Sequence, residues 1–256
     1  MDTSPRKVAI VAALEREVRP LVRGWKSYRL PAADGLHRLR FFESESAVVV
    51  CGGIGREAAT EATRTVIERY RPEVVVSAGF AGALVPELRV ASVLVPDRVI
   101  LASTGTAFGT GAAGRGVLVT VAAVAGPEEK RRLAERFSAQ AVDMEAAAVA
   151  RAAQAEGAGF RALKAISDEL DFSPPPTEGF IDARGEFKTL RFAVFVAKRP
   201  WLWASARAFG RNSALAAEAL AKALAGFVRE AAQGSAPSSA RQHVDPIPAT
   251  GVTTQG

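Results

Sequence analysis

Six short apolar runs recur along the first two thirds of the chain and alternate with segments of helical character. The runs are KVAIVAAL (7–14), SAVVVCGG (46–53), EVVVSAG (73–79), SVLVPDRVIL (92–101), GVLVTVAAV (116–124) and FRALKAIS (160–167). They are apolar along their whole length and not at alternate positions, which is typical of strands covered on both faces of a sheet. The sequence therefore predicts a layered α/β fold.

Helical patterns fill the intervals between these runs. Residues 55–70 are amphipathic and end before Arg-Pro, residues 127–136 open with proline and two glutamates, and residues 144–157 close with glycine. Two further helices are predicted over residues 189–198 and 203–232. Residues 172–187, rich in proline and glycine, are predicted to form a loop.

The length of 256 residues suits one α/β domain with a large core. We predict a single catalytic domain over residues 1–232. Residues 233–256 contain mainly serine, proline, threonine and glycine with few large apolar side chains. This composition predicts a disordered C-terminal tail.

The chain is expected to be cytoplasmic. Its first apolar run is only about eight residues long and is followed by Glu15 and Glu17, which argues against a secretory signal. The single cysteine, Cys51, excludes an intrachain disulfide framework and fits a reducing compartment. No apolar run is long enough and sufficiently free of charge to span a bilayer.

The formal net charge of +6 and the sequence pI near 9.9 invite a nucleic-acid hypothesis. We discount it because the arginines are scattered among glutamates, and we expect no nucleic-acid partner. The densest basic region, residues 184–211, places arginines and lysines among phenylalanine and tryptophan. Such a region is either a surface helix near acidic lipid or, more commonly, the solvent-exposed face of a helix that packs on the core.

Acidic residues must carry most of any acid–base chemistry in this chain. The only histidines are His37 and His243, so a Ser-His-Asp triad or a histidine-rich metal site is not expected, and we predict neither a metal nor a cofactor. Carboxylates instead stand at the ends of three predicted strands. Glu17 follows the first run, Asp143 and Glu145 close AQAVDME (139–145), and Asp168 closes the run that begins at residue 160.

The carboxyl ends of strands are where open α/β sheets bind ligands, so these carboxylates could converge on one pocket. Each of them also has an ordinary explanation as a turn cap, a helix cap or a solvated residue. Asp143 in particular suits a cap at the switch from strand to helix, which would leave Glu145, two residues further on, to face a ligand.

Four segments in order resemble the purine nucleoside phosphorylase and 5′-methylthioadenosine/S-adenosylhomocysteine nucleosidase superfamily. They are VAIVAALEREVRPLV, CGGIGREAATEATRTVIERYRPEVVVSAGFAGAL, AVDMEAAAVARAAQAEG and FRALKAISDELD. The resemblance implies a three-layer α/β/α fold with a central mixed, partly barrel-like sheet. It also implies cleavage of a purine N-glycosidic bond.

Roles for individual residues follow from this resemblance. Asp168 matches the general acid that protonates N7 of the leaving base, and Ser167 would support it. Glu17 matches the carboxylate that positions and deprotonates the attacking water. Glu145 matches the acid that binds the ribose 2′- and 3′-hydroxyls, and Met144 would pack on the sugar.

Four further positions are expected to contact substrate, three of them with departures from the family pattern. Lys164 stands where the nucleosidases tend to have arginine. Gly79 and Phe80 belong to SAGFAGA, in which Phe80 replaces a small hydroxyl residue. Val124 lies on the purine-facing run, which lacks the usual aromatic side chain.

Water is the expected nucleophile, because the first turn reads AALEREV as in nucleosidases and not as the Gly-Asp-Pro phosphate loop of phosphorylases. Arg56, which follows the GGIG turn, could bind an anion, so phosphate stays an alternative as co-substrate. The alternatives to a nucleosidase are therefore a phosphate-dependent purine nucleoside phosphorylase and a non-catalytic nucleoside-binding protein on the same fold.

The short stretch 98–116 and the C-terminal segment with Trp201 and Trp203 resemble the hopanoid-associated branch, whose members remove adenine from adenosylhopane. This resemblance predicts an adenine nucleoside with a bulky 5′ group, lipid-linked or of the methylthioadenosine type. It also predicts a homodimer with peripheral contact to the inner membrane surface through residues 184–211.

Overall fold

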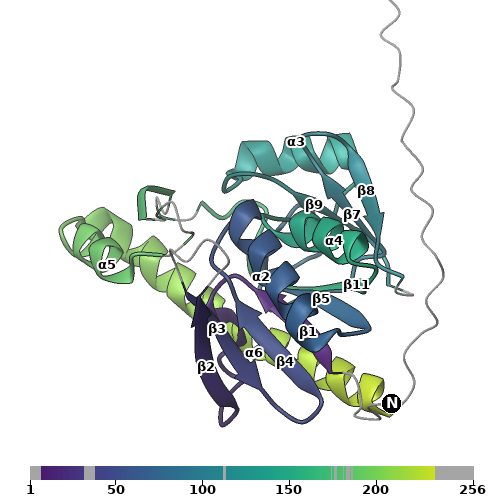
Figure 1. The fold of residues 1–256 in the computed structure, drawn as a ribbon. Helices are drawn as coiled ribbons and strands as arrows, with labels where there is room; N and C mark the ends of the chain where they lie inside the picture. The colour runs from purple at the N-terminus through teal and green to yellow at the C-terminus, as the bar shows by residue number, and fades with distance from the viewer. Residues whose placement is uncertain are drawn as a thin grey trace, which may run out of the picture.

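The computed structural model of the chain has three layers, with one mixed sheet between two sets of helices, as predicted (Figure 1). It describes residues 7–31, 38–111, 114–173, 175, 178–180, 182, 185 and 187–233. Both histidines, Arg184 and the predicted tail beyond residue 233 lie outside the described residues.

Within those residues, eleven strands form the sheet. Its order is β2-β3-β4-β1-β5-β10-β9-β7-β8, and β11 pairs with β5 and β6. The strands are β1 (Val8–Ala12), β2 (Lys26–Pro31), β3 (Arg38–Glu43), β4 (Ala47–Cys51), β5 (Val74–Ala83), β6 (Val93–Leu94), β7 (Arg98–Leu101), β8 (Thr106–Gly109), β9 (Val117–Thr120), β10 (Ala141–Asp143) and β11 (Gly159–Asp168).

Strand β5 organises the sheet because it pairs with three other strands. β11 runs parallel to it along almost its whole length. On its other side, β1 pairs in parallel with the first half, at Val75–Ser77, and β10 pairs antiparallel with the second half, at Gly82–Ala83. The ends of β1, β5, β10 and β11 are thereby brought together around one strand.

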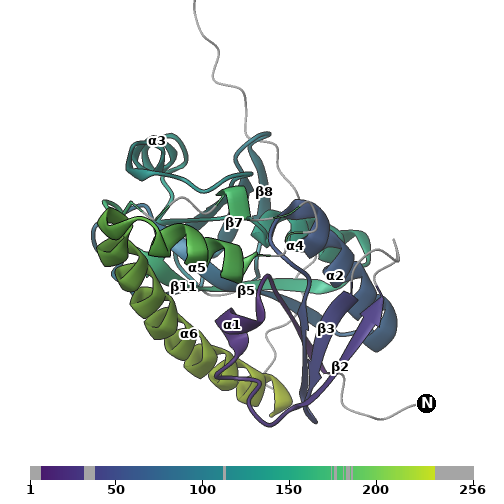
Figure 2. The same ribbon diagram turned by 90° about the vertical axis from the view of Figure 1, so that its left-hand side faces the viewer.

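Helices cover both faces of the sheet (Figure 2). The long α6 (Trp203–Ala232) packs on β11 and β5 together with α1 (Glu15–Val18), whereas α2 (Arg56–Tyr70) packs with α4 (Ala146–Ala155) on the opposite face. The remaining helical segments are α3 (Pro127–Phe137) against β9 and β10, η1 (Glu178–Phe180), α5 (Thr189–Ala197) and η2 (Pro200–Leu202).

The two apolar faces explain why the strands lack alternation. In β1, Ala9 and Val11 pack into the core beneath α2 and α4, while Val8, Ile10 and Ala12 pack into the core beneath α6. All five residues are buried. A strand buried on both faces needs apolar side chains at every position, as the run KVAIVAAL predicts.

Three of the predicted strands were wrong in extent by more than two residues. The run 73–79 continues as β5 to Ala83. The run 92–101 is two strands, β6 and β7, because Pro96 and Asp97 interrupt it and proline cannot donate to a ladder. The run 116–124 ends as a strand at Thr120, and Val121 onward is loop. The hairpin of β2 and β3 and the strand β8 were not predicted.

The alanines of α4 allow this helix to lie close against its neighbours. Ala153 is fully buried, whereas Ala155 at the end of the helix is exposed. Leucine at position 153 would add volume to a closely packed interface, and leucine at position 155 would extend into solvent.

We therefore expect Ala153→Leu to lower the free energy of unfolding by about 1–3 kcal/mol. Ala155→Leu, the matched control, should change it by less than about 0.5 kcal/mol. Urea unfolding followed by circular dichroism measures both values. Equal stability of the two variants would contradict the tight packing of α4.

Candidate active site

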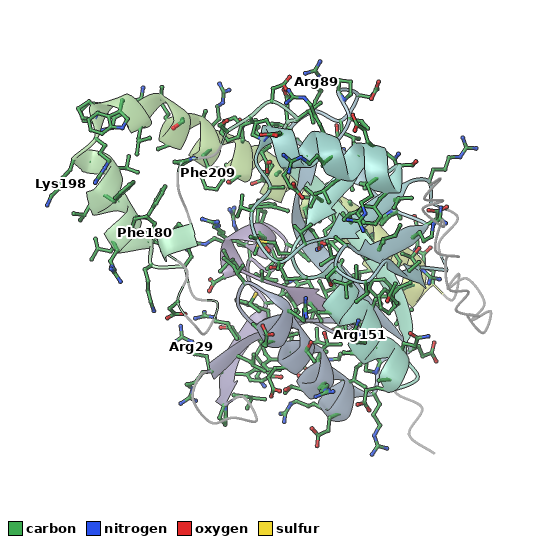
Figure 3. All side chains as sticks on the ribbon, turned by 90° about the horizontal axis from the view of Figure 1, so that it is seen from above. Arg29, Arg89, Arg151, Phe180, Lys198 and Phe209 are labelled. Carbon is green, nitrogen blue, oxygen red and sulfur yellow. The ribbon has the colours of Figure 1, made fainter. Side chains whose placement is uncertain are left out.

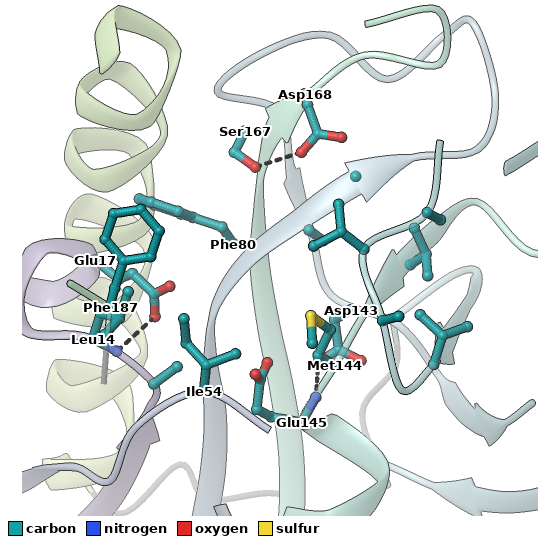
Figure 4. A pocket seen from close by; sticks show the side chains of 18 of the residues that line it. Leu14, Glu17, Ile54, Phe80, Asp143, Met144, Glu145, Ser167, Asp168 and Phe187 are labelled. Carbon is teal, nitrogen blue, oxygen red and sulfur yellow. Dashed lines mark hydrogen bonds between the residues drawn. The ribbon is translucent and has the colours of Figure 1, made fainter. Parts of the chain in front are cut away.

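A cavity of about 160 Å³ opens where the four central strands end (Figure 4). Glu17 enters it from α1, which follows β1, and Phe80 enters it from β5. Glu145 enters from the turn after β10, and Ser167 and Asp168 enter from the end of β11. The carboxylates that follow three separate apolar runs in the sequence thus line one space. This convergence agrees with the general position of ligand sites in α/β sheets.

Glu17 lies in α1 and is only 7% exposed. Its Oε2 accepts a hydrogen bond from the Leu14 amide at 3.4 Å. Burial raises the pKa of Glu17, and the nearby charges of Arg16 and Lys164 offset part of the rise. Gly79 makes room for this carboxylate: its φ is +154°, and a Cβ there would lie 3.0 Å from Glu17 Oε2.

Lys164 is a buried cation behind the cavity. Its Nζ lies 2.9 Å from Asp143 Oδ2, and both side chains are almost fully buried. Burial alone lowers the pKa of Lys164, but the negative charges of Asp143, Glu145 and Glu17 outweigh it, so the pKa stands above its ordinary value. Lys164 therefore remains an ammonium and balances part of the charge of three carboxylates.

Asp143 has the capping role expected from the sequence. Its Oδ2 accepts hydrogen bonds from the amides of Ala146 at 2.8 Å and Glu145 at 3.4 Å, and its Oδ1 accepts from Thr120 Oγ1 at 2.6 Å. With Lys164 as its fourth partner, Asp143 is fixed at the base of the site. Its position orients the first turn of α4 and hence Glu145.

Glu145 points into the cavity from the N-terminus of α4 (Figure 4). Its Oε1 accepts a hydrogen bond from the Gly55 amide at 2.9 Å. Burial, with the neighbouring charge of Asp143, raises the pKa of Glu145 to about 7. The side chain can therefore exchange a proton near neutral pH and can accept hydrogen bonds from sugar hydroxyls once ionised.

Asp168 and Ser167 reach the cavity together because β11 is irregular at its end. The register against β5 shifts between Ile166 and Asp168. Ser167 Oγ donates to Asp168 Oδ1 at 2.7 Å, and Lys130 Nζ donates to Asp168 Oδ2 at 2.5 Å. Both carboxylate oxygens of Asp168 thus have a donor.

Apolar and aromatic side chains form the rest of the lining. Phe80 and Met144 flank the acids, and Val124 contributes from the loop after β9. Phe187 and Phe209 close the side formed by the C-terminal segment, with the Arg16 guanidinium over their rings at 5.2 and 6.0 Å from the centroids. Such a lining suits a ligand with apolar parts as well as hydroxyl groups.

Seven of the nine substrate or catalytic residues named from the sequence line the cavity, and two lie behind it. The seven are Glu17, Phe80, Val124, Met144, Glu145, Ser167 and Asp168. Gly79 and Lys164 support Glu17 and Asp143 from behind. Arg56 is exposed at the start of α2 and is not in the lining, whereas Arg16 is.

Sequence reasoning missed Lys130, Arg16, Phe187 and Phe209. Phe187 follows a loop, and Phe209 lies near the start of the long helix α6. Nothing in the sequence around either residue indicates that it lies at the site. One feature of the sequence could have drawn attention to Lys130. It is a cation in the first turn of a helix, where the helix dipole disfavours positive charge.

The fold and the site thus define an α/β protein in which four carboxylates, from α1 and from the ends of β10 and β11, line one partly aromatic cavity. The family model described as "Phosphorylase superfamily" matches residues 7–115 and 112–197, and the chain belongs to this superfamily. Its expected fold and superfamily are both confirmed.

Similar proteins include nucleosidases. The 5′-methylthioadenosine/S-adenosylhomocysteine nucleosidase of Tolumonas auensis is 34% identical over 97 residues, covering 36% of this chain and 41% of that protein. The chain therefore matches less than half the length of such curated relatives. The corresponding nucleosidase of Helicobacter pylori has a TM-score of 0.67 at 19% identity, over 89% of this chain and 100% of the other.

The futalosine hydrolase of the same organism has a TM-score of 0.66 at 19% identity, over 88% of this chain and 98% of the other. At this identity the two solved structures show that the fold is shared.

The raised pKa of Glu145 makes folding stability depend on pH. The folded protein holds the proton up to about pH 7, whereas the ordinary value is 4.5. The contribution of Glu145 to stability is therefore fully present in acid and falls as pH rises through this interval. Between pH 5 and 8 we expect the free energy of unfolding to fall by roughly 2 kcal/mol more in wild type than in Glu145→Gln.

Urea unfolding at the two pH values measures this difference. Glu218→Gln, on the exposed side of α6, is the matched control and should keep the wild-type pH dependence. The same pH dependence in Glu145→Gln as in wild type would contradict a raised pKa at Glu145.

Proposed function

We propose that the chain cleaves the N-glycosidic bond of an adenine nucleoside with a bulky 5′ substituent and releases adenine. The observation that carries this proposal is the convergence of Glu17, Glu145 and Asp168 on one cavity. A pure nucleoside-binding protein needs acceptors for the sugar hydroxyls, but it has no need of two further carboxylates at separate sides of the ligand.

Each carboxylate takes one task in the proposed reaction. Asp168 gives its proton to N7 of the purine as the bond between C1′ and the base breaks, and the bonding electrons leave with the base. Glu17 accepts a proton from the water whose oxygen bonds to C1′. Burial, which raises the pKa of Glu17, strengthens it as a base. Glu145 binds the 2′- and 3′-hydroxyls.

The relatives support this reaction class. Those that match in sequence are named as nucleosidases of methylthioadenosine and adenosylhomocysteine, and one of the structures with the shared fold is a futalosine hydrolase. The Helicobacter nucleosidase was solved with a pyrrolidine inhibitor that carries a deazaadenine-like base.

Adenine release from methylthioadenosine, followed by chromatography, tests the proposed activity. We expect Asp168→Asn to lower kcat/KM at least about 100-fold, because the leaving base loses its proton donor. Asp171→Asn, three residues further on and exposed, is the matched control and should stay within about twofold. Bound nucleoside without adenine release in wild type would instead support a non-catalytic binding protein.

Phosphorolysis is the second candidate, and Arg16 favours it. This guanidinium lines the cavity beside Glu17, where it could hold an anion as the nucleophile. The sugar product separates the two reactions: hydrolysis yields the free pentose, and phosphorolysis yields the pentose 1-phosphate. We favour water, because the buried Glu17 carboxylate lines the cavity and can accept a proton from a water molecule there.

The aromatic side of the cavity supports a large apolar 5′ group. Phe80, Phe187 and Phe209 line it together, and none of them offers a hydrogen bond to a polar substituent. We therefore propose a substrate of the adenosylhopane type over methylthioadenosine. Competition between an adenosine with a long 5′-alkyl chain and methylthioadenosine tests this choice.

We also propose that residues 187–211, here called the basic arm, contact a bilayer with anionic headgroups. The arm comprises α5, η2 and the start of α6, and α5 extends away from the body of the molecule (Figures 1 and 3). It contains six lysines and arginines and no acidic residue. Large apolar side chains on it are exposed, namely Leu190, Val194, Trp201 and Trp203.

Basic and aromatic side chains on one projecting helical segment suit an interfacial location. No helix in the described ranges is long and apolar enough to cross a membrane, so the proposed contact is peripheral. The alternative partner for the basic arm is a second copy of this chain, in the expected homodimer.

Cosedimentation with phosphatidylglycerol vesicles tests the proposed contact between the basic arm and an anionic bilayer. We expect wild type to bind these vesicles but not phosphatidylcholine vesicles, and Trp201→Ala with Trp203→Ala to weaken binding about tenfold or more. Leu215→Ala, an exposed apolar residue of α6 outside the arm, is the control. Unchanged vesicle binding, or a change of oligomeric state in its place, would contradict the membrane role.

A further inference from the structure

Lys130 is a buried lysine that the proposed reaction does not yet use. It lies in the first turn of α3 and is 1% exposed. Two physical effects disfavour a cation there. The N-terminus of a helix carries partial positive charge, and burial removes the ammonium from water. A lysine at such a position needs compensating contacts.

Those contacts come from the end of β11. Lys130 Nζ donates to Asp168 Oδ2 at 2.5 Å and to the Glu169 carbonyl at 2.8 Å. The carboxylate of Asp168 is 17% exposed, against 1% for the lysine. Lys130 also lines the cavity, but its side chain is almost fully buried and its ammonium is bonded to Asp168 and to the Glu169 carbonyl.

The neighbouring strand leaves space for this pair. A Cβ on Gly82 of β5 would lie 2.8 Å from Asp168 Oδ2 and 3.0 Å from Lys130 Cε. Only glycine accommodates the pair at this distance.

We infer that Lys130 is a positioning residue for the proton donor of the proposed reaction. It holds Asp168 by Oδ2 and stabilises the charge that develops on this carboxyl group as the proton leaves. In this step the O–H bond of Asp168 breaks, the N7–H bond of the base forms, and the O–H electrons stay on the carboxylate. Lys130 remains protonated throughout, and the ion pair in the structure has the charges reached after transfer.

Preorganised positive charge next to a developing negative charge lowers the barrier of such a step, because no solvent has to reorganise. The inference rests on the proposed function, since it assigns Lys130 to the same proton transfer. It also predicts that the benefit of Lys130 depends on whether the leaving base needs a proton.

Two substrates and two variants separate this role from a structural one. The substrates are a 5′-substituted adenosine and its N7-methylated analogue, whose cationic base leaves without protonation. On the first substrate we expect Lys130→Met to lower kcat about 100-fold with KM within about threefold. On the N7-methylated substrate the loss should be less than about tenfold. Lys130→Arg, which keeps the charge, should restore much of the activity.

Lys222→Met, on the exposed side of α6, is the matched control and should behave as wild type. Gly82→Ala tests the same pair without removing the lysine, and should also impair the first substrate more than the second. These variants keep the inference testable where Lys130→Met does not fold, as judged by circular dichroism.

Equal losses on the two substrates, a loss confined to KM, or full activity of Lys130→Met would overturn the role of Lys130 and leave the proposed function standing. A wild-type protein that releases base from neither substrate would overturn the proposed function itself, and the inference with it.

Discussion

The site depends on one ammonium, that of Lys164, placed among three carboxylates. Asp143 contacts it directly, and Glu17 and Glu145 lie close enough to raise its pKa. Burying these acids without a cation would cost several kcal/mol each, because they would lose hydration without a compensating charge. Arg16 adds a second positive charge next to Glu17. Burial, together with the charge of Asp143, still raises the pKa of Glu145 to about 7. β10 and β11 both pair with β5, and this pairing brings Asp143 and Lys164 together. The order of the strands therefore also determines the charges that surround the cavity.

Much of the fold was predictable from local pattern. The helices over 55–70, 127–136, 189–198 and 203–232 match α2, α3, α5 and α6 to within one residue at each end, because their apolar periodicity and terminal residues are strong signals. The β2–β3 hairpin was missed because it is an edge element with many charged residues, and its strands lack the continuous apolar runs that revealed the others.

The acids of the site could be found from their position after buried strands, whereas their partners could not. Lys130 and Asp168 are separated by 38 residues, and a lysine within PEEKRRLAER has the composition of a solvated helix. Phe209 reaches the cavity because α6 packs along β11, and Phe187 reaches it from the segment before α5. These contacts depend on how distant elements pack, and local sequence does not encode that packing. The same two phenylalanines belong to the basic arm, so the surface proposed to meet lipid is continuous with the cavity wall.

The irregular end of β11 has a consequence for how this scaffold can change. In a regular strand, Ser167 and Asp168 would face opposite sides of the sheet. The register shift after Ile166 lets both side chains reach the cavity, and it lies within the pairing of β11 with β5. Residues beyond 172 take no part in this pairing, so we expect substitutions among them to leave Asp168 in place. In the proposed reaction, the end of β11 therefore carries the group that reacts, whereas the downstream segment, which contributes Phe187 and Phe209 to the cavity, determines which substrates fit.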